Sequence, residues 1–341
     1  MNYGKKGVRA KQKALNSKSQ KWGRKLALTC VKIMLAAVVG IGICGVAAGI
    51  GVFRGILSST PTIRLSDVVA VGEATIVYDR EGNEIDQYVS TNSNRLSVGM
   101  DEIPDYLGKA FVAIEDERFY QHNGIDFKSI IRAGYQFFKT GGEEAQGAST
   151  ITQQLLKNTV FTDWTSEGNN KIKKIKRKIQ EQYLALEITK YYSKDEILLR
   201  YMNAINLGQN TLGVESASLR YFGKHCSELT ISECAVIASI TQNPSKYNPI
   251  RHPEENVKRR EKCLNKMLEL GFISQTQYDE AMADTDAVYE RIGLYDIDYQ
   301  EANATTGSYF SDAVYEQVKQ DLILSGYNEN MAETLLTSGG L

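Results

Sequence analysis

The chain has 341 residues, with 40 lysines and arginines against 41 aspartates and glutamates, so its formal charge is close to neutral. This length predicts about two domains, and a composition of 42% hydrophobic and 24% charged residues excludes a disordered or low-complexity chain. Five cysteines are too few for a small disulfide-rich scaffold.

Charge is distributed unevenly along the chain. Twelve basic residues and no acidic residue precede Asp67, which leaves 28 basic and 41 acidic residues for the remainder. The remainder therefore carries no net positive field, and we expect no binding of nucleic acid.

Residues 33–53 form a run of 21 residues without a charge, which predicts a transmembrane helix because about 20 apolar residues cross the hydrocarbon core. Ten lysines and arginines within residues 5–32 predict that the N-terminus stays in the cytoplasm. A cleaved signal peptide is the alternative, but its apolar segment is usually only about 7–15 residues long. We therefore predict a single-pass protein of the cell membrane, with a basic cytoplasmic tail (residues 1–32) and with the chain after Arg54 outside the cytoplasm.

A short β-hairpin is predicted beyond the anchor. Residues 74–78 and 84–88 alternate like two strands, and Gly82 and Asn83 between them favour a tight turn. We assign the hairpin to a juxtamembrane segment, residues 54–94.

Helix signals dominate the rest of the chain. Ser149 is predicted as a helix N-cap, and capping boxes begin at Ser193, Thr230 and Ser274. Gly223 has the position of a helix C-cap. The fold class is therefore predicted to be mainly α.

We expect one compact helical domain over residues 95–271. A helical tail, residues 272–341, would follow it.

The segment 171–192 predicts a helix with two contrasting faces. Lys173, Arg177 and Glu181 recur every four residues and share one face, for which exposure to solvent is the simplest interpretation. An apolar stripe on the opposite face is expected to be the core side, and its members are Ile172, Ile175, Ile179, Tyr183 and Leu186.

Two further motifs carry polar residues at suggestive spacing. Residues 113–124 contain the adjacent carboxylates Glu115 and Asp116, which by themselves could simply cap and solvate a helix end. Residues 147–154 read G-A-S-T-I-T-Q-Q and are followed by Lys157. A helix start with hydroxyls and a trailing lysine suits a phosphate or an array of sugar hydroxyls.

Together these motifs resemble the peptidoglycan glycosyltransferase (transglycosylase) domain of class A penicillin-binding proteins. The E-D-x-x-F-x-x-H-x-G motif begins at Glu115, the G-x-S-T-I-T-Q-Q motif at Gly147, and the R-K-x-x-E-x-x-x-A motif at Arg177. Two further blocks, residues 201–224 and 233–249, follow in the family's order. The resemblance implies a lysozyme-like helical glycosyltransferase domain.

The resemblance implies an enzyme that polymerises lipid II, a disaccharide-pentapeptide on undecaprenyl pyrophosphate, into β-1,4-linked glycan strands. Attack of a sugar hydroxyl with inversion at the anomeric carbon needs a base, and release of undecaprenyl pyrophosphate needs positive charge. The expected partners are lipid II, the growing glycan strand and membrane lipid. A homodimer or a cell-wall synthesis complex is a further expectation.

By resemblance, Glu115 would be the base, Asp116 would orient the site, and Glu181 would orient the cations or assist on the leaving-group side. The implied substrate-binding residues are Ser149, Thr150, Gln153, Gln154, Lys157, Lys173, Arg177 and Lys178. No cofactor is required, and no metal-binding residues are predicted, although a divalent Mg²⁺ or Mn²⁺ could share the charge of the pyrophosphate.

Two other functions stay open: a lysozyme-like glycan hydrolase, which also needs a glutamate, and a non-catalytic cell-wall scaffold. The sequence contains no S-x-x-K motif, so the motif set of a penicillin-sensitive transpeptidase is incomplete. We expect the chain to be the N-terminal part of a longer protein.

Overall fold

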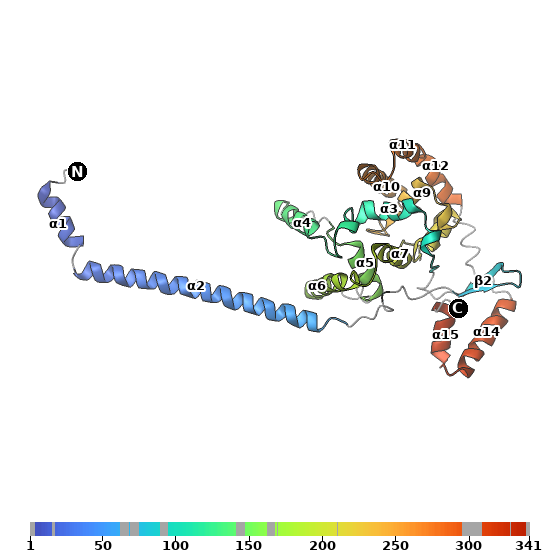
Figure 1. Cartoon of the computed structure of the whole chain (residues 1–341), viewed down its shortest axis with the longest axis horizontal. Helices are drawn as coiled ribbons and strands as arrows, with labels where there is room; N and C mark the ends of the chain where they lie inside the picture. Colours follow the sequence, from blue (N-terminus) through green and yellow to red (C-terminus); the bar gives the residue numbers. More distant parts are fainter. Residues whose placement is uncertain are drawn as a thin grey trace. The chain divides into compact units, whose positions relative to one another are not determined.

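The computed structural model describes the chain in the following ranges: residues 4–15, 18–61, 68, 75–88, 95–140, 147–161, 168, 170–209, 211–294, 309–327 and 329–338. The chain divides into two compact units, Met1–Pro61 and Thr62–Leu341. Figure 1 labels most of their helices and one strand of the hairpin. The fold is mainly α, as the sequence predicts.

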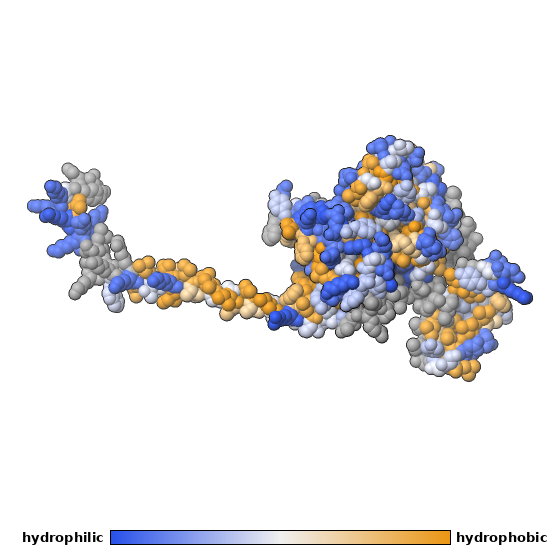
Figure 2. Space-filling view, in the orientation of Figure 1, coloured by the Kyte–Doolittle hydropathy of each residue, from blue (hydrophilic) through white to orange (hydrophobic). Residues whose placement is uncertain are grey.

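The first unit consists of the helices α1 (Lys5–Leu15) and α2 (Lys18–Ser58). Within α2, Lys25–Ser58 is the one helical stretch among the described residues that is long and apolar enough to cross a membrane. Figure 2 shows this stretch as a largely apolar surface. The helix extends beyond the predicted span of residues 33–53 at both ends, because lysine and arginine are themselves good helix formers.

The predicted hairpin is present. Strand β1 (Thr75–Tyr78) pairs antiparallel with β2 (Glu84–Tyr88), with Thr75 opposite Tyr88. In the turn, Gly82 adopts a φ of 88°, a conformation that costs glycine little.

The hairpin packs on the C-terminal helices of the same unit. It contacts α15 (Glu329–Ser338), which packs on α14 (Tyr309–Leu324). The Tyr88 hydroxyl donates to the Ser311 carbonyl, and the Tyr88 ring lies edge-on to Tyr315, 5.2 Å between centroids. The segments before and after the main helical domain are therefore joined.

The main domain contains the helices α3 (Asp105–Glu115), α4 (Phe127–Lys139), α5 (Ile151–Thr159), α6 (Lys171–Ile188), α7 (Lys194–Ala204), α8 (Val214–Phe222), α9 (Ile231–Ile240), α10 (Pro253–Glu269), α11 (Gln275–Ala283) and α12 (Thr285–Leu294). Helix α9 is its core element: the nine residues from Ser232 onward are all buried, and α3 and α10 pack against it. Helix α5 packs on both α6 and α7. The core continues through Ile273, Ala281 and Ile292, past the predicted boundary at residue 271.

The helix caps largely follow the sequence. Ser193, Thr230 and Ser274 each form a capping box, and Gly223 ends α8 in the left-handed conformation. The prediction of Ser149 as an N-cap is wrong by one residue, because Thr150 caps α5. The Thr150 hydroxyl donates to the Gly124 carbonyl at 2.7 Å, a tertiary bond that holds Thr150 outside the helix.

The predicted orientation of α6 is also wrong. Its buried residues are Gln180, Glu181, Leu184, Ala185 and Ile188, whereas the apolar stripe expected to face the core is largely exposed. The exposed fractions are 80% for Ile172, 60% for Ile175, 41% for Tyr183 and 37% for Leu186. Of the charged face, Glu181 is buried whereas Lys173 is exposed, so burial on α6 follows the side that packs on α5 and not the apolar stripe.

Helix α4 exposes an apolar face as well. Phe127, Ile131, Tyr135 and Phe137 are each at least half exposed. Together with the α6 stripe, they form a set of large apolar side chains that the described part of the domain does not cover.

Candidate active site

Glu115 is the last residue of α3, and its carboxylate is 10% exposed. Among the described residues, three side chains donate to it. The Arg259 guanidinium reaches Oε1 at 2.8 Å, the Thr241 hydroxyl donates to the same oxygen, and Gln154 Nε2 reaches Oε2 at 2.9 Å. Donors on both oxygens suit the carboxylate form, which is the form that a general base requires.

These donors come from three different helices. Gln154 lies on α5, Thr241 is the C-cap of α9, and Arg259 lies on α10. The buried Tyr201 hydroxyl donates to Gln154 Oε1 at 3.3 Å and so orients the amide toward Glu115. Burial, followed by the nearby negative charge of Glu115, raises the pKa of Tyr201 well above its usual value, which keeps this hydroxyl a donor.

Asp116 faces away from these partners although it follows Glu115 directly. Its carboxylate contacts His122 Nε2 at 2.9 and 3.0 Å and accepts from the backbone N–H of Ile151 at 3.1 Å. Ile151 is the first residue of α5, where a carboxylate also interacts favourably with the helix dipole. Asp116 thus ties the end of α3 to the start of α5.

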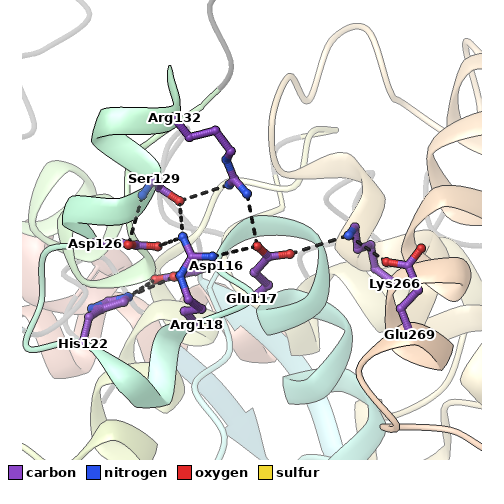
Figure 3. Close-up of polar contacts among 9 residues, drawn as sticks. All are labelled: Asp116, Glu117, Arg118, His122, Asp126, Ser129, Arg132, Lys266 and Glu269. Carbon is purple, nitrogen blue, oxygen red and sulfur yellow. Dashed lines mark hydrogen bonds and ion pairs between the residues drawn. The ribbon is translucent and has the colours of Figure 1, made fainter. Parts of the chain in front are cut away.

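An ionic network extends this connection to α4 and α10 (Figure 3). Glu117 lies 3.1 Å from Arg118, 3.3 Å from Arg132 of α4 and 3.6 Å from Lys266 of α10. Burial opposes its charge, but the hydrogen bond from Arg132 and the charges of Lys266 and Arg118 bring the pKa of Glu117 below its usual value. Arg118 also pairs with Asp126 at 2.6 Å. The segment that follows Glu115, residues 116–126, is therefore held by ion pairs to α4 and α10.

Gly124 packs the segment after Glu115 closely against α6. Its φ is 88°, and a Cβ placed there would lie 2.3 Å from the carbonyl oxygen of Ala185. Ala185 lies one turn beyond Glu181, so this close contact fixes the distance between the loop of Glu115 and the helix of Glu181.

Glu181 is fully buried and carries two cations from its own helix. Lys178 Nζ lies 2.7 Å from Oε2, and Arg177 contacts Oε1. Lys178 remains 39% exposed and reaches the surface, whereas Arg177 is 14% exposed and lies largely buried beside it. This cluster can present positive charge to an anionic group from outside.

The remaining predicted binding residues are spread over α5 and α6. Thr150 is buried as the cap of α5, and Ser149 is half-buried just before it. Lys157 is half-buried on α5, one turn after Gln154, and Lys173 is exposed on α6.

Gln153 differs from its neighbours on α5. It is 1% exposed, and neither of its amide atoms has a hydrogen-bond partner among the described residues.

Arg259 and Thr241 were missed by the sequence analysis. They lie 144 and 126 residues from Glu115, and no local pattern connects them to it. Among the described residues, no group of three histidine, cysteine or acidic side chains could hold a metal ion, so a role for Mg²⁺ or Mn²⁺ stays a prediction.

The transglycosylase family model matches residues 81–268, which is more than half of the chain and includes both glutamate clusters. The chain belongs to the transglycosylase family. Among its relatives, penicillin-binding protein 1A of Clostridium perfringens strain 13 is 38% identical over 89% of this chain and 44% of its own length. Penicillin-binding protein 1A/1B of Bacillus subtilis is 34% identical over 92% of this chain and 33% of its own length.

This transglycosylase chain thus spans less than half the length of these relatives. The crystal structure of penicillin-binding protein 1A from Haemophilus influenzae matches it with a TM-score of 0.35 and 21% identity, over 80% of this chain and 26% of that one. That similarity is too low to carry an argument about this chain.

Proposed function

We propose that the chain is a membrane-anchored peptidoglycan glycosyltransferase. It polymerises lipid II into β-1,4-linked glycan strands, with inversion at the anomeric carbon and release of undecaprenyl pyrophosphate. The observation that carries this proposal is the pair of clusters joined by one loop: a nearly buried carboxylate held by donors, and a group of cations around Glu181.

Glu115 is the general base in this proposal. A carboxylate that accepts from Gln154, Thr241 and Arg259 is held in a fixed orientation. It takes the proton of the acceptor hydroxyl while that oxygen attacks the anomeric carbon of the donor. A positioned base of this kind contributes about 10²–10⁴-fold to a rate.

The cationic group on α6 stabilises the leaving pyrophosphate. Arg177 and Lys178 are fixed by Glu181, Lys178 reaches the surface, and Lys173 extends the positive charge by one turn. Cations that are already in place stabilise developing negative charge without further reorganisation. A divalent metal could share this role.

Membrane attachment suits a substrate whose lipid tail stays in the bilayer. The apolar stretch of α2 is long enough to span the membrane. The exposed apolar faces of α4 and α6 can enter the interfacial layer, because such faces bind membranes in proportion to the apolar area they bury. The basic N-terminus favours a cytoplasmic tail and a catalytic domain outside the cell.

The decisive experiment compares the wild-type chain with Glu115→Gln on labelled lipid II, using Glu280→Gln, an exposed acid on α11, as the matched control. We expect the wild type and the control to lengthen glycan strands, and Glu115→Gln to lose at least about 10²-fold in rate. Shortening of preformed glycan by the wild type would indicate a hydrolase instead. Unchanged polymerisation by Glu115→Gln would contradict the proposal and favour the alternative of a non-catalytic cell-wall scaffold.

A further inference from the structure

The two oxygens of the Glu115 carboxylate have different surroundings. Among the described residues, Oε1 accepts from both Arg259 and Thr241, whereas Oε2 accepts from Gln154 alone. Each carboxylate oxygen has about two acceptor positions. Oε1 is therefore saturated, and Oε2 keeps one position for a further hydrogen.

Arg259 is held at several points. Its Nε donates to the Ser239 carbonyl at 3.1 Å, its Nη1 donates to Gln242 Oε1 at 2.7 Å, and its Nη2 reaches Glu115 at 2.8 Å. The guanidinium also lies 5.0 Å from the Tyr247 ring, and the side chain is only 10% exposed. Such an arginine has little freedom to follow a substrate, so its contact with Glu115 is a fixed part of the protein.

The titratable groups around the pair of Arg259 and Glu115 lie on several elements. Its titratable neighbours are Cys263 of α10, Tyr201 of α7 and Tyr247, whose ring lies beside the guanidinium, and Asp116 at the end of α3 acts on Tyr201. Burial raises the pKa of the Cys263 thiol to about 12, and both this thiol and the Tyr201 phenol stay neutral near pH 7. Arg259 is thus the cation that hydrogen-bonds directly to Glu115 among the described residues.

We propose that Arg259, assisted by Thr241, is a positioning residue that holds Oε1 and leaves Oε2 as the oxygen that accepts the proton. This inference rests on the proposed function. The acceptor O–H bond breaks as the new O–H bond forms at Oε2, and the electron pair left on the acceptor oxygen makes the new bond to the anomeric carbon. The bond from that carbon to the pyrophosphate oxygen breaks, and its electron pair leaves with the pyrophosphate.

The test uses Arg259→Met and Arg259→Lys in the full chain, with Lys258→Met as the control that removes a neighbouring exposed cation from the same helix. We expect Arg259→Met to lower kcat on lipid II by about 10²-fold, with KM changed less than about 3-fold, because misplacing a catalytic group by about 1 Å costs that much. The acidic limb of its pH profile moves to higher pH, since the cation that favours the carboxylate is gone. Arg259→Lys restores the limb and part of kcat, and Lys258→Met behaves like the wild type.

An Arg259→Met enzyme with the kcat and acidic limb of Lys258→Met would overturn the inference. If Arg259→Met does not fold, Arg259→Lys decides: a wild-type kcat overturns the positioning role, and a reduced kcat at an unchanged limb supports it.

A wild type that fails to polymerise lipid II defeats the proposed function instead. Thermal melting of Glu115→Gln, Arg259→Met and the double variant then still tests the pair. Non-additive shifts in Tm support the coupling, and additive shifts overturn it.

Discussion

The two glutamate clusters are built in opposite ways. Glu181 takes both of its cations from its own helix, three and four residues earlier, and its carboxylate is fully buried. Glu115 takes its donors from three other helices, 39, 126 and 144 residues away along the chain. The first cluster is therefore secured by helix geometry, whereas the second depends on the packing of the whole domain.

Gly124→Ala is expected to have the largest effect, because it disturbs the contact that fixes the distance between the Glu115 cluster and the Glu181 cluster. The new Cβ meets the Ala185 backbone, and the backbone conformation disfavours any residue except glycine. Strain and overpacking together lower the free energy of unfolding by about 2–5 kcal/mol. Chemical denaturation measures this loss, and we expect activity on lipid II to fall with it.

Gly134→Ala is the matched glycine control, because a Cβ there meets nothing within 4 Å. It lies inside α4, where alanine is the better helix former by about 1 kcal/mol. Equal losses in the two variants would contradict the role of Gly124 as the link.

Glu181→Gln comes next and tests the local cluster. It leaves Arg177 and Lys178 without their carboxylate in a helix that also carries four other lysines in its first half. We expect a loss of about 1–3 kcal/mol in the free energy of unfolding, limited because Lys178 is 39% exposed and can turn to solvent. Denaturation at low and high salt measures it, and a loss that salt does not reduce would speak against charge repulsion as the cause.

The dependence of stability on acidic pH tests the ion pairs of Glu117, which hold the segment after Glu115. Because the pKa of Glu117 in the folded chain lies below its ordinary value of 4.5, its contribution is present above that pH and is lost as the pH falls through the folded pKa. Arg132→Met weakens this contribution by less than about 1 kcal/mol, since Arg132 is 48% exposed. Unfolding measured from about pH 6 downward should therefore show a shallower decline in the variant than in the wild type.

The smallest effect is expected at His225, whose contact with the Glu215 carboxylate joins residues ten positions apart. The hydrogen bond to Glu215 raises the pKa of His225 above 6.5, so its contribution is complete below that pH and is lost as the pH rises through the folded pKa. The His225 side chain is 72% exposed, and screening by water limits the effect to at most about 0.5 kcal/mol. The stability of His225→Gln should change less between pH 6 and 8 than that of the wild type.

Interpretation from the sequence succeeded where the deciding interaction is local. The hairpin follows from strands on either side of a glycine turn, and three capping boxes follow from residues three positions apart. His122 of the E-D-x-x-F-x-x-H-x-G motif contacts Asp116 six residues away, so both partners lie within one motif.

Interpretation failed where a tertiary contact overrides a local pattern. Thr150, and not Ser149, caps α5 because the Thr150 hydroxyl donates to the Gly124 carbonyl. The apolar stripe of α6 was expected to be buried, yet Ile172 is 80% exposed and Glu181 is fully buried. Periodicity shows that a helix has two faces, but it does not decide which face the neighbouring elements cover.

The amino-acid sequence by itself determined the apolar span, the three capping boxes, the order of the motifs and the adjacency of Glu115 and Asp116, because each depends on residues within a few positions of one another. Only the tertiary structure decided that these two carboxylates turn to different partners, that Glu181 is buried with its cations, and that Arg259 and Thr241 hold Glu115. The contacts of Glu115 form when helices distant in the chain pack together, and no local pattern along the sequence shows which helices will do so.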